Sequence, residues 1–135
     1  MAAKTQKLTL PAQHAKTAKG REAYYRGTAA EASVERAYAE QGGRLLGARW
    51  RGTAGEIDLI FMLEETYVFC EVKAAPTFEA AMMRLQPTQM RRIHAAASEY
   101  LGQTPLGQLS DVRFDLACVN AQGEVRLLEN AFGHF

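Results

Sequence analysis

The sequence has few cysteines and no long apolar run. Among its 135 residues are two cysteines, four prolines and three histidines. No stretch approaches the roughly 20 apolar residues that a membrane-spanning helix needs, so we expect no membrane segment. The basic N-terminus is not followed by an apolar run, which argues against a secretory signal and predicts a cytoplasmic protein.

Isolated cysteines and histidines exclude several kinds of site. Cys70 and Cys118 each stand alone in an apolar run, which predicts buried free thiols and not a zinc site or a disulfide framework. The three histidines His14, His94 and His134 lack metal-ligand spacing, and we assign none of them a catalytic role. The chain also has no glycine-rich phosphate loop and no serine or cysteine nucleophile arrangement.

The composition is that of an ordinary globular domain. Hydrophobic residues make up 47% of the chain and charged residues 23%, which excludes a disordered tail, a coiled coil and a collagen-like repeat. The length fits one domain. However, residues 1–27 carry six basic residues against Glu22 alone, although the whole chain has a net charge of only +1. We therefore expect a basic, flexible arm over residues 1–27 and a single domain over residues 28–135. Such an arm either contacts nucleic acid or only solubilises the terminus.

Hydrophobic periodicity predicts alternating helices and strands. Helices are expected over residues 29–41 and 87–101, with a short helical turn at 78–84. Strands are expected over residues 44–50, 56–63, 66–73, 111–119 and 124–128. This order predicts an α/β fold with a mixed sheet.

Two consecutive strands carry acidic residues. Glu56 and Asp58 lie on the strand 56–63, and Glu71 and Lys73 lie on the strand 66–73. A hairpin turn centred on residues 64–65 places Asp58 opposite Glu71, and Glu56 opposite Lys73. Directly opposed β-carbons lie about 4.5–5.5 Å apart, so the two carboxylates converge. Such a pair is unfavourable unless a positive group lies between them.

This pattern has two interpretations. Carboxylate oxygens suit Mg²⁺ or Mn²⁺ better than zinc, and such an ion lowers the pKa of a bound water and binds a scissile phosphodiester. Lys73 would then orient the attacking hydroxide or balance the developing charge. In the other interpretation, Glu56 and Lys73 form a structural cross-strand pair, and Asp58 and Glu71 lie at a solvated edge.

The same residues carry a family resemblance. The chain resembles the YraN-like family of small bacterial proteins, within the restriction-endonuclease-like PD-(D/E)XK superfamily. The resemblance covers about residues 27–132. The matching segments are Glu31, residues 55–60, Glu71-Val72-Lys73, Arg92-Ile93, Tyr100-Leu101, Arg113-Phe114-Asp115 and Ala131-Phe132.

The resemblance implies an α/β fold with a mixed four- to five-stranded sheet flanked by helices, that is, a restriction-endonuclease-like core. It also implies a nuclease site. Asp58 and Glu71 would be direct metal ligands, and Glu31 on the first helix would help to bind or position the metal. Lys73 would be the catalytic lysine, and Glu56 would hold it from outside the metal's coordination. Without the resemblance, Glu31 could equally be a surface glutamate.

At three positions the sequence departs from the pattern of this family. Family members usually carry a lysine where this chain has Gln89, an arginine where it has Ala75, and an asparagine where it has Arg49. Gln89 can still hydrogen-bond a phosphate or a water next to the site, but it brings no charge.

Basic residues near these strands are candidates for phosphate contacts. They are Arg49, Arg51, Arg91 and Arg92, besides the N-terminal arm. Trp50 either stacks on an unpaired base or packs against the sheet.

These residues lead to two hypotheses of function. The first is a Mg²⁺- or Mn²⁺-dependent endonuclease that hydrolyses DNA, which we favour over RNA as the substrate; a homodimer is left open. The alternative is a non-catalytic nuclease-fold module that binds nucleic acid or a protein partner in DNA repair or uptake.

Overall fold

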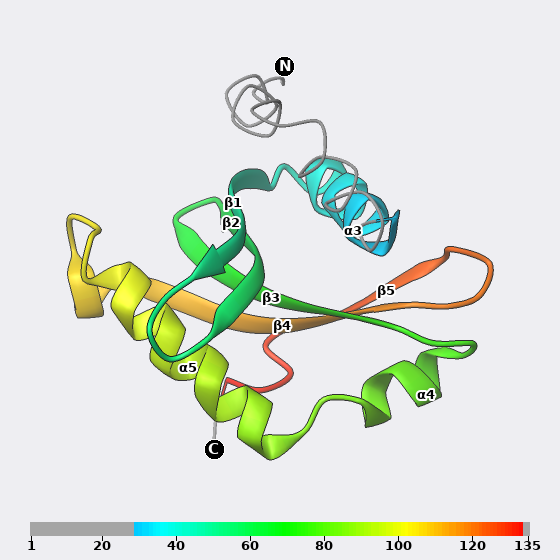
Figure 1. The fold of residues 1–135 in the computed structure, drawn as a ribbon. Helices are drawn as coiled ribbons and strands as arrows, with labels where there is room; N and C mark the ends of the chain where they lie inside the picture. The colour runs from blue at the N-terminus through cyan, green and yellow to red at the C-terminus, as the bar shows by residue number, and fades with distance from the viewer. Residues whose placement is uncertain (1–28, 134–135) are drawn as a thin grey trace, which may run out of the picture.

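The computed structural model describes residues 29–133, which form a five-stranded sheet with helices on both faces (Figure 1). The predicted arm, residues 1–27, and the start of the predicted domain at residue 28 lie outside the described residues. The helices are α3 (Ala29–Glu40), α4 (Phe78–Met83), α5 (Pro87–Leu101) and a short 3₁₀ turn, η2 (Gly107–Leu109). The strands are β1 (Arg44–Arg51), β2 (Glu56–Leu63), β3 (Thr66–Ala74), β4 (Asp111–Val119) and β5 (Val125–Leu128). The α/β prediction is therefore confirmed.

The sheet is mixed, as predicted. Its strand order is β1-β2-β3-β4-β5, and β3 and β4 are parallel while every other neighbouring pair is antiparallel. Parallel neighbours need a long crossover, and here α4 and α5 supply it between β3 and β4. None of the helices in residues 29–133 is long and apolar enough to cross a membrane.

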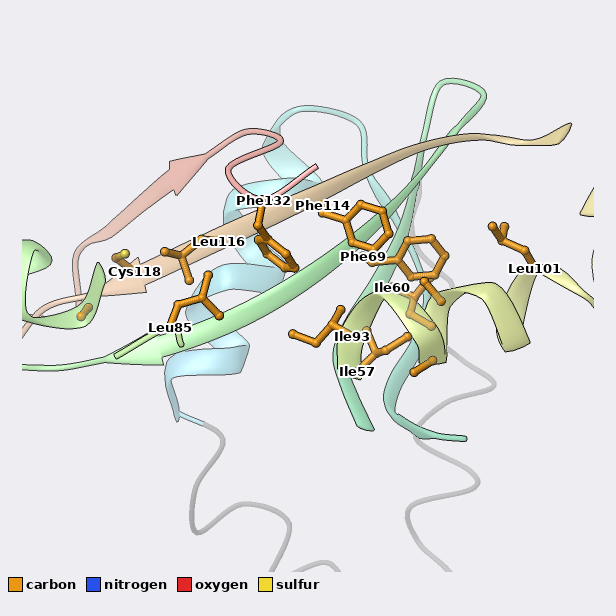
Figure 2. Close-up of a cluster of buried hydrophobic side chains, with 13 residues drawn as sticks. Ile57, Ile60, Phe69, Leu85, Ile93, Leu101, Phe114, Leu116, Cys118 and Phe132 are labelled. Carbon is orange, nitrogen blue, oxygen red and sulfur yellow. The ribbon is translucent and has the colours of Figure 1, made fainter. Parts of the chain in front are cut away.

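Each face of the sheet has its own hydrophobic cluster. On one face, Val34 and Tyr38 of α3 pack on strand residues that include Leu59 and Phe61. On the other face, Ile93 and Leu101 of α5 pack on a group of aromatic and aliphatic strand side chains, which Figure 2 shows. Cys70 and Cys118 are buried free thiols in these two clusters, as predicted.

The ends of α3 and α5 follow from local sequence. Proline suits the first turn of a helix because its missing N–H has no intrahelical acceptor there, and α5 begins at Pro87. At the end of α3, Gly42 has φ +89°, a conformation that favours glycine. The N–H groups of Gly42 and Gly43 then donate to the carbonyls of Ala39 and Tyr38, which closes the helix.

A buried polar network fixes α3 on the sheet. The Tyr38 hydroxyl donates to Asp115 Oδ2 on β4 at 2.6 Å, and Arg113 donates to both oxygens of the same carboxylate at 3.0 and 2.8 Å. The N–H of Asn130 donates to Asp115 Oδ1 at 2.8 Å. A fully buried carboxylate is tolerated only with such partners. The network therefore sets where α3, and the residues on it, lie above the sheet.

The β1–β2 hairpin twists sharply near its closed end. Ile57 and Leu59 are two residues apart on β2, and Ala48 and Trp50 are two residues apart on β1, yet each pair contacts two different hydrophobic clusters. Regular alternation would place both members of a pair on one face, so the hairpin must rotate between them. The rotation is centred on Arg49, whose φ is +54°.

Past the twist, the hairpin lies against α5. The Trp50 ring meets the Tyr100 ring edge-on with 5.4 Å between centroids, so Trp50 packs in the core as one of its two interpretations predicted. The Glu99 carboxylate on α5 accepts from the Thr53 N–H at 2.8 Å and from the Thr53 hydroxyl at 2.6 Å. The loop between β1 and β2 is therefore tied to α5.

Candidate metal and active site

A pocket of about 300 Å³ opens where β2 leaves β3 beneath the first turns of α5. It contains five of the residues that the sequence singled out. Its lining residues are Gly55, Glu56, Asp58, Glu71, Gln89, Arg92 and Ile93.

Asp58 and Glu71 lie together as the sequence predicted. The register of β2 and β3 is the predicted one. Moving away from the turn, the last regular pair is Leu59 with Cys70, and Asp58 and Glu71 occupy the next position. The two carboxyl groups are joined by a hydrogen bond. Asp58 Oδ2 also accepts the Val72 N–H at 2.9 Å. Since the backbone ladder has ended there, the Asp58 side chain takes over a backbone donor of β3.

Burial makes this carboxyl pair hold a proton. Glu71 is 4% exposed, and burial together with the neighbouring Asp58 raises its pKa to about 8. The pKa of Asp58 is also raised, mainly by burial, although the Val72 N–H opposes the shift. Burial and the mutual repulsion of the two carboxylates outweigh the nearby Lys73, so the metal-free pair shares a proton.

Two further side chains hold Glu71. Lys73 Nζ lies 3.1 Å from Glu71 Oε2, and Gln89 Nε2 donates to the same oxygen at 2.7 Å. Lys73 is itself only 19% exposed, so its ammonium group is confined next to the pair. Gln89 therefore contacts the predicted metal ligand directly, from the first turn of α5.

Glu56 does not reach Lys73. Its carboxylate lies 3.0 Å from Arg51 Nη2 on β1. The expected Glu56–Lys73 pairing assumed that β2 and β3 stay in register beyond Leu59, but the strands separate there. The alternative interpretation was a Glu56–Lys73 ion pair with Asp58 and Glu71 at a solvated edge. It is wrong for the ion pair and for Glu71, which is 4% exposed.

Glu31 faces the sheet from α3. It is 6% exposed, so the surface-glutamate interpretation is wrong. Burial raises its pKa to about 7; Arg49 lowers this pKa, and the charges of Asp58 and Glu56 raise it. Arg49 Nε lies 3.4 Å from Glu31 Oε1. Glu31 is thus close to the acidic pair but already has a cation beside it.

The donor set fits a hard divalent cation with an incomplete protein shell. Within residues 29–133, no three acidic, histidine or cysteine side chains come together as a metal cluster. Two adjacent carboxylates remain, Asp58 and Glu71. Mg²⁺ typically binds through one or two carboxylates and keeps waters or takes substrate phosphates for its other positions. The site therefore suits such an ion better than a structural zinc.

The four candidate arginines are placed differently. Arg92 lines the pocket, and Arg91 is exposed next to it on α5. Arg51 is exposed at the closed end of the hairpin and pairs with Glu56, whereas Arg49 pairs with Glu31. Only Arg92 combines exposure with a position at the pocket.

Sequence reasoning missed how the pocket edge is built. A β-carbon at Gly55 would lie 3.3 Å from the β-carbon of Arg92, so glycine lets the β1–β2 loop approach α5 closely. Glu99 then fixes that loop through Thr53. The glycine before the acidic strand was the available signal, but only the tertiary packing identifies its neighbour.

Comparisons with known proteins cover nearly all of the described chain. A family model described as "Uncharacterised protein family UPF0102" matches residues 30–119. A UPF0102 protein of Roseobacter denitrificans is 48% identical over 122 residues, which cover 90% of this chain and 95% of the relative. One from Ruegeria pomeroyi is 49% identical over 108 residues, covering 80% and 88% respectively. One from Cereibacter sphaeroides is 47% identical over 113 residues, covering 84% and 97%.

Proposed function

Because the chain belongs to the uncharacterised protein family UPF0102, which confirms the YraN-like resemblance, its function must be argued from its own site. We propose that it is a Mg²⁺- or Mn²⁺-dependent endonuclease that hydrolyses DNA phosphodiester bonds. The observation that carries this proposal is the buried Asp58–Glu71 pair, with the Lys73 ammonium 3.1 Å from Glu71, at the wall of an open pocket.

A pair of buried acids is costly unless something compensates it. Burial raises the pKa of both groups, so folding the metal-free chain leaves the pair partly protonated. A structural role would be served better by an apolar pair or by one acid with one base. A divalent cation on Asp58 and Glu71 would remove the repulsion, and when bound it would lower the pKa of a water and neutralise phosphate charge.

The chain's own residues have distinct roles in this proposal. Asp58 and Glu71 hold the ion, and Gln89 keeps the Glu71 carboxylate in place through its 2.7 Å hydrogen bond. Lys73 is held beside the same carboxylate, where its ammonium group orients a hydroxide or balances charge on the phosphate. Arg92, at the rim of the pocket, is placed to contact a substrate phosphate.

A second candidate function rests on the small number of positive charges at this site. Gln89 gives Glu71 a neutral donor where the family resemblance implies a lysine, and Ala75 offers no cation two residues beyond Lys73. A nuclease-fold module that binds nucleic acid without cutting it would need no more charge than this. In that case, binding would depend on salt and not on the metal.

Metal binding and cleavage together test both candidates. Calorimetry with Mn²⁺ should show binding that Asp58→Ala and Glu71→Ala abolish, with Glu64→Ala, an exposed turn residue, as the matched control. Forked, nicked and single-stranded DNA should then be cut only with metal and only by the native chain and the control. Cleavage that persists in Asp58→Ala would contradict the nuclease proposal. DNA binding without cleavage that survives EDTA and Asp58→Ala would favour the second candidate.

A further inference from the structure

Arg49 has an unusual backbone conformation next to the acidic site. Its φ of +54° lies in the left-handed region, which glycine and asparagine tolerate far better than arginine. The regular pairs on either side of it are Ala48 with Leu59 and Trp50 with Ile57, so Arg49 lies opposite Asp58 across β1 and β2. Such a strained backbone persists only where the surrounding contacts hold the residue in place.

The Arg49 side chain is directed to a buried acid. Its Nε lies 3.4 Å from Oε1 of Glu31, whose side chain is only 8% exposed. The other charges that act on Glu31 are those of Asp58 and Glu56, and both are negative. Arg49 is therefore the neighbouring cation that makes the Glu31 carboxylate tolerable at this position.

The same contact competes with a metal ion for Glu31. A guanidinium group only donates hydrogen bonds and keeps its charge, so a carboxylate bound to it is a weaker ligand for a divalent cation. The absence of any three-ligand cluster among residues 29–133 agrees with such a division of the acids. Asp58 and Glu71 line the pocket together, whereas the third acid, Glu31, is paired with an arginine.

We propose that Arg49 is a resident counter-cation that holds Glu31 out of the metal's coordination, so that this chain binds one divalent ion on Asp58 and Glu71 alone. The inference rests on the proposed metal site. It assigns Arg49 as a positioning residue and changes the role that the family resemblance implies for Glu31.

A double-mutant cycle tests the inference without measuring activity. Mn²⁺ affinity and stoichiometry would be measured by calorimetry at pH 8 for the native chain, Arg49→Asn, Glu31→Gln and the double variant. The native chain should bind one ion, and Glu31→Gln should change its affinity less than threefold. Arg49→Asn should free Glu31 and tighten binding about tenfold. In the Glu31→Gln background, Arg49→Asn should have no such effect.

Two controls separate this coupling from a general effect of charge or of misfolding. Arg44→Asn removes the same charge from an exposed position on the same strand, and it should leave Mn²⁺ affinity unchanged. Arg49→Lys keeps the cation and should bind Mn²⁺ as the native chain does. Circular dichroism melts would establish that each variant is folded.

Four results would overturn the inference. A tenfold loss of affinity in Glu31→Gln would make Glu31 a ligand in the native chain. If Arg49→Asn raised Mn²⁺ affinity equally in the native and Glu31→Gln backgrounds, Arg49 would act only through its overall positive charge and not through Glu31. If the native chain binds Mn²⁺ and Asp58→Asn does not, but Arg49→Asn has native affinity, only the Arg49 inference fails. No Mn²⁺ binding by the native chain would overturn both this inference and the metal site.

Discussion

The Asp58 carboxylate accepts the Val72 N–H at 2.9 Å at the point where the β2–β3 ladder has ended. The side chain of one strand therefore replaces the backbone of that strand as the partner of β3. Because the side chain accepts this hydrogen bond, β2 can separate from β3 without leaving the Val72 N–H unsatisfied. The pocket opens in the resulting gap. One residue thus both shapes the pocket and supplies an oxygen to it.

Replacing Asp58 by asparagine should separate these two roles. Asparagine keeps a carbonyl oxygen that can accept the Val72 N–H, but it removes the charge that a metal ligand needs. We expect Asp58→Asn to unfold in urea within about 1 kcal/mol of the native chain and to lose Mn²⁺ binding. Asp58→Ala, which removes the acceptor as well, should be the less stable of the two. If Asp58→Asn binds Mn²⁺ with native affinity, Asp58 is not a ligand.

Gln89→Lys should speed cleavage without tightening metal binding, because a cation beside Glu71 both favours its ionised form and competes with the metal for it. Gln89 donates to Glu71 Oε2 at 2.7 Å, so a lysine there would bring a second ammonium group to the same carboxylate. A nearby positive charge stabilises the ionised carboxyl, so the pKa of Glu71 should fall. At pH 7 a carboxyl group with a pKa of about 8 is ionised in about one molecule in ten, so full ionisation should speed metal-dependent DNA cleavage by about tenfold. Gln86→Lys, an exposed residue directly before α5, is the matched control.

Tyr38→Phe should destabilise the fold through Asp115. The variant removes the 2.6 Å hydrogen bond to a carboxylate that is fully buried, while Arg113 and the Asn130 N–H remain. Loss of one hydrogen bond to a buried charged group costs about 1–3 kcal/mol in the free energy of unfolding, which urea denaturation would measure.

The control for this variant is Tyr67→Phe. It removes a hydroxyl group from a side chain that packs against the hydrophobic cluster containing Ile93 and Leu101. It should lower the free energy of unfolding less than Tyr38→Phe does. Equal losses in the two variants would show that the Tyr38–Asp115 bond adds nothing specific.

Much of this fold could be predicted because its strands follow simple rules. Two apolar runs flank the Glu64-Glu65 turn, and that symmetry alone sets the β2–β3 register that brings Asp58 to Glu71. The period of α5 and the position of Pro87 gave both ends of that helix. These features are local, so neighbouring residues determine them.

What escaped prediction depends on tertiary structure. Because the hairpin twists at Arg49 and β2 separates from β3, Glu56 pairs with Arg51 and not with Lys73 as expected. The partner of Gln89 is 18 residues away in sequence, and the partner of Tyr38 on Asp115 is 77 residues away. Hydrophobic periodicity cannot predict such contacts, because they form only when α3, the β1–β2 hairpin and α5 pack on the rest of the sheet.

The stability of the metal-free protein should fall as pH rises from 5 to 8. In the unfolded chain Glu71 ionises near its ordinary pKa of 4.5, whereas in the folded chain its pKa is about 8. Between these values the unfolded chain has lost a proton that the folded chain still holds, so raising the pH favours unfolding. Glu31, with a pKa of about 7, acts in the same direction over a narrower range. We expect a loss of several kcal/mol in the free energy of unfolding, about 1.4 kcal/mol for each pH unit over which only the unfolded chain has lost the proton.

Urea denaturation at each pH would measure this slope, and Glu71→Gln isolates its cause. The variant has no carboxyl group to ionise at this position, so its stability should change less between pH 5 and pH 8 than that of the native chain. Mn²⁺ should stabilise the native chain more at pH 8 than at pH 6, because a metal ligand must first lose its proton. A slope that Glu71→Gln leaves unchanged would place the responsible proton elsewhere. A stabilisation by Mn²⁺ that is independent of pH would mean that the ion does not displace the proton held by Asp58 and Glu71.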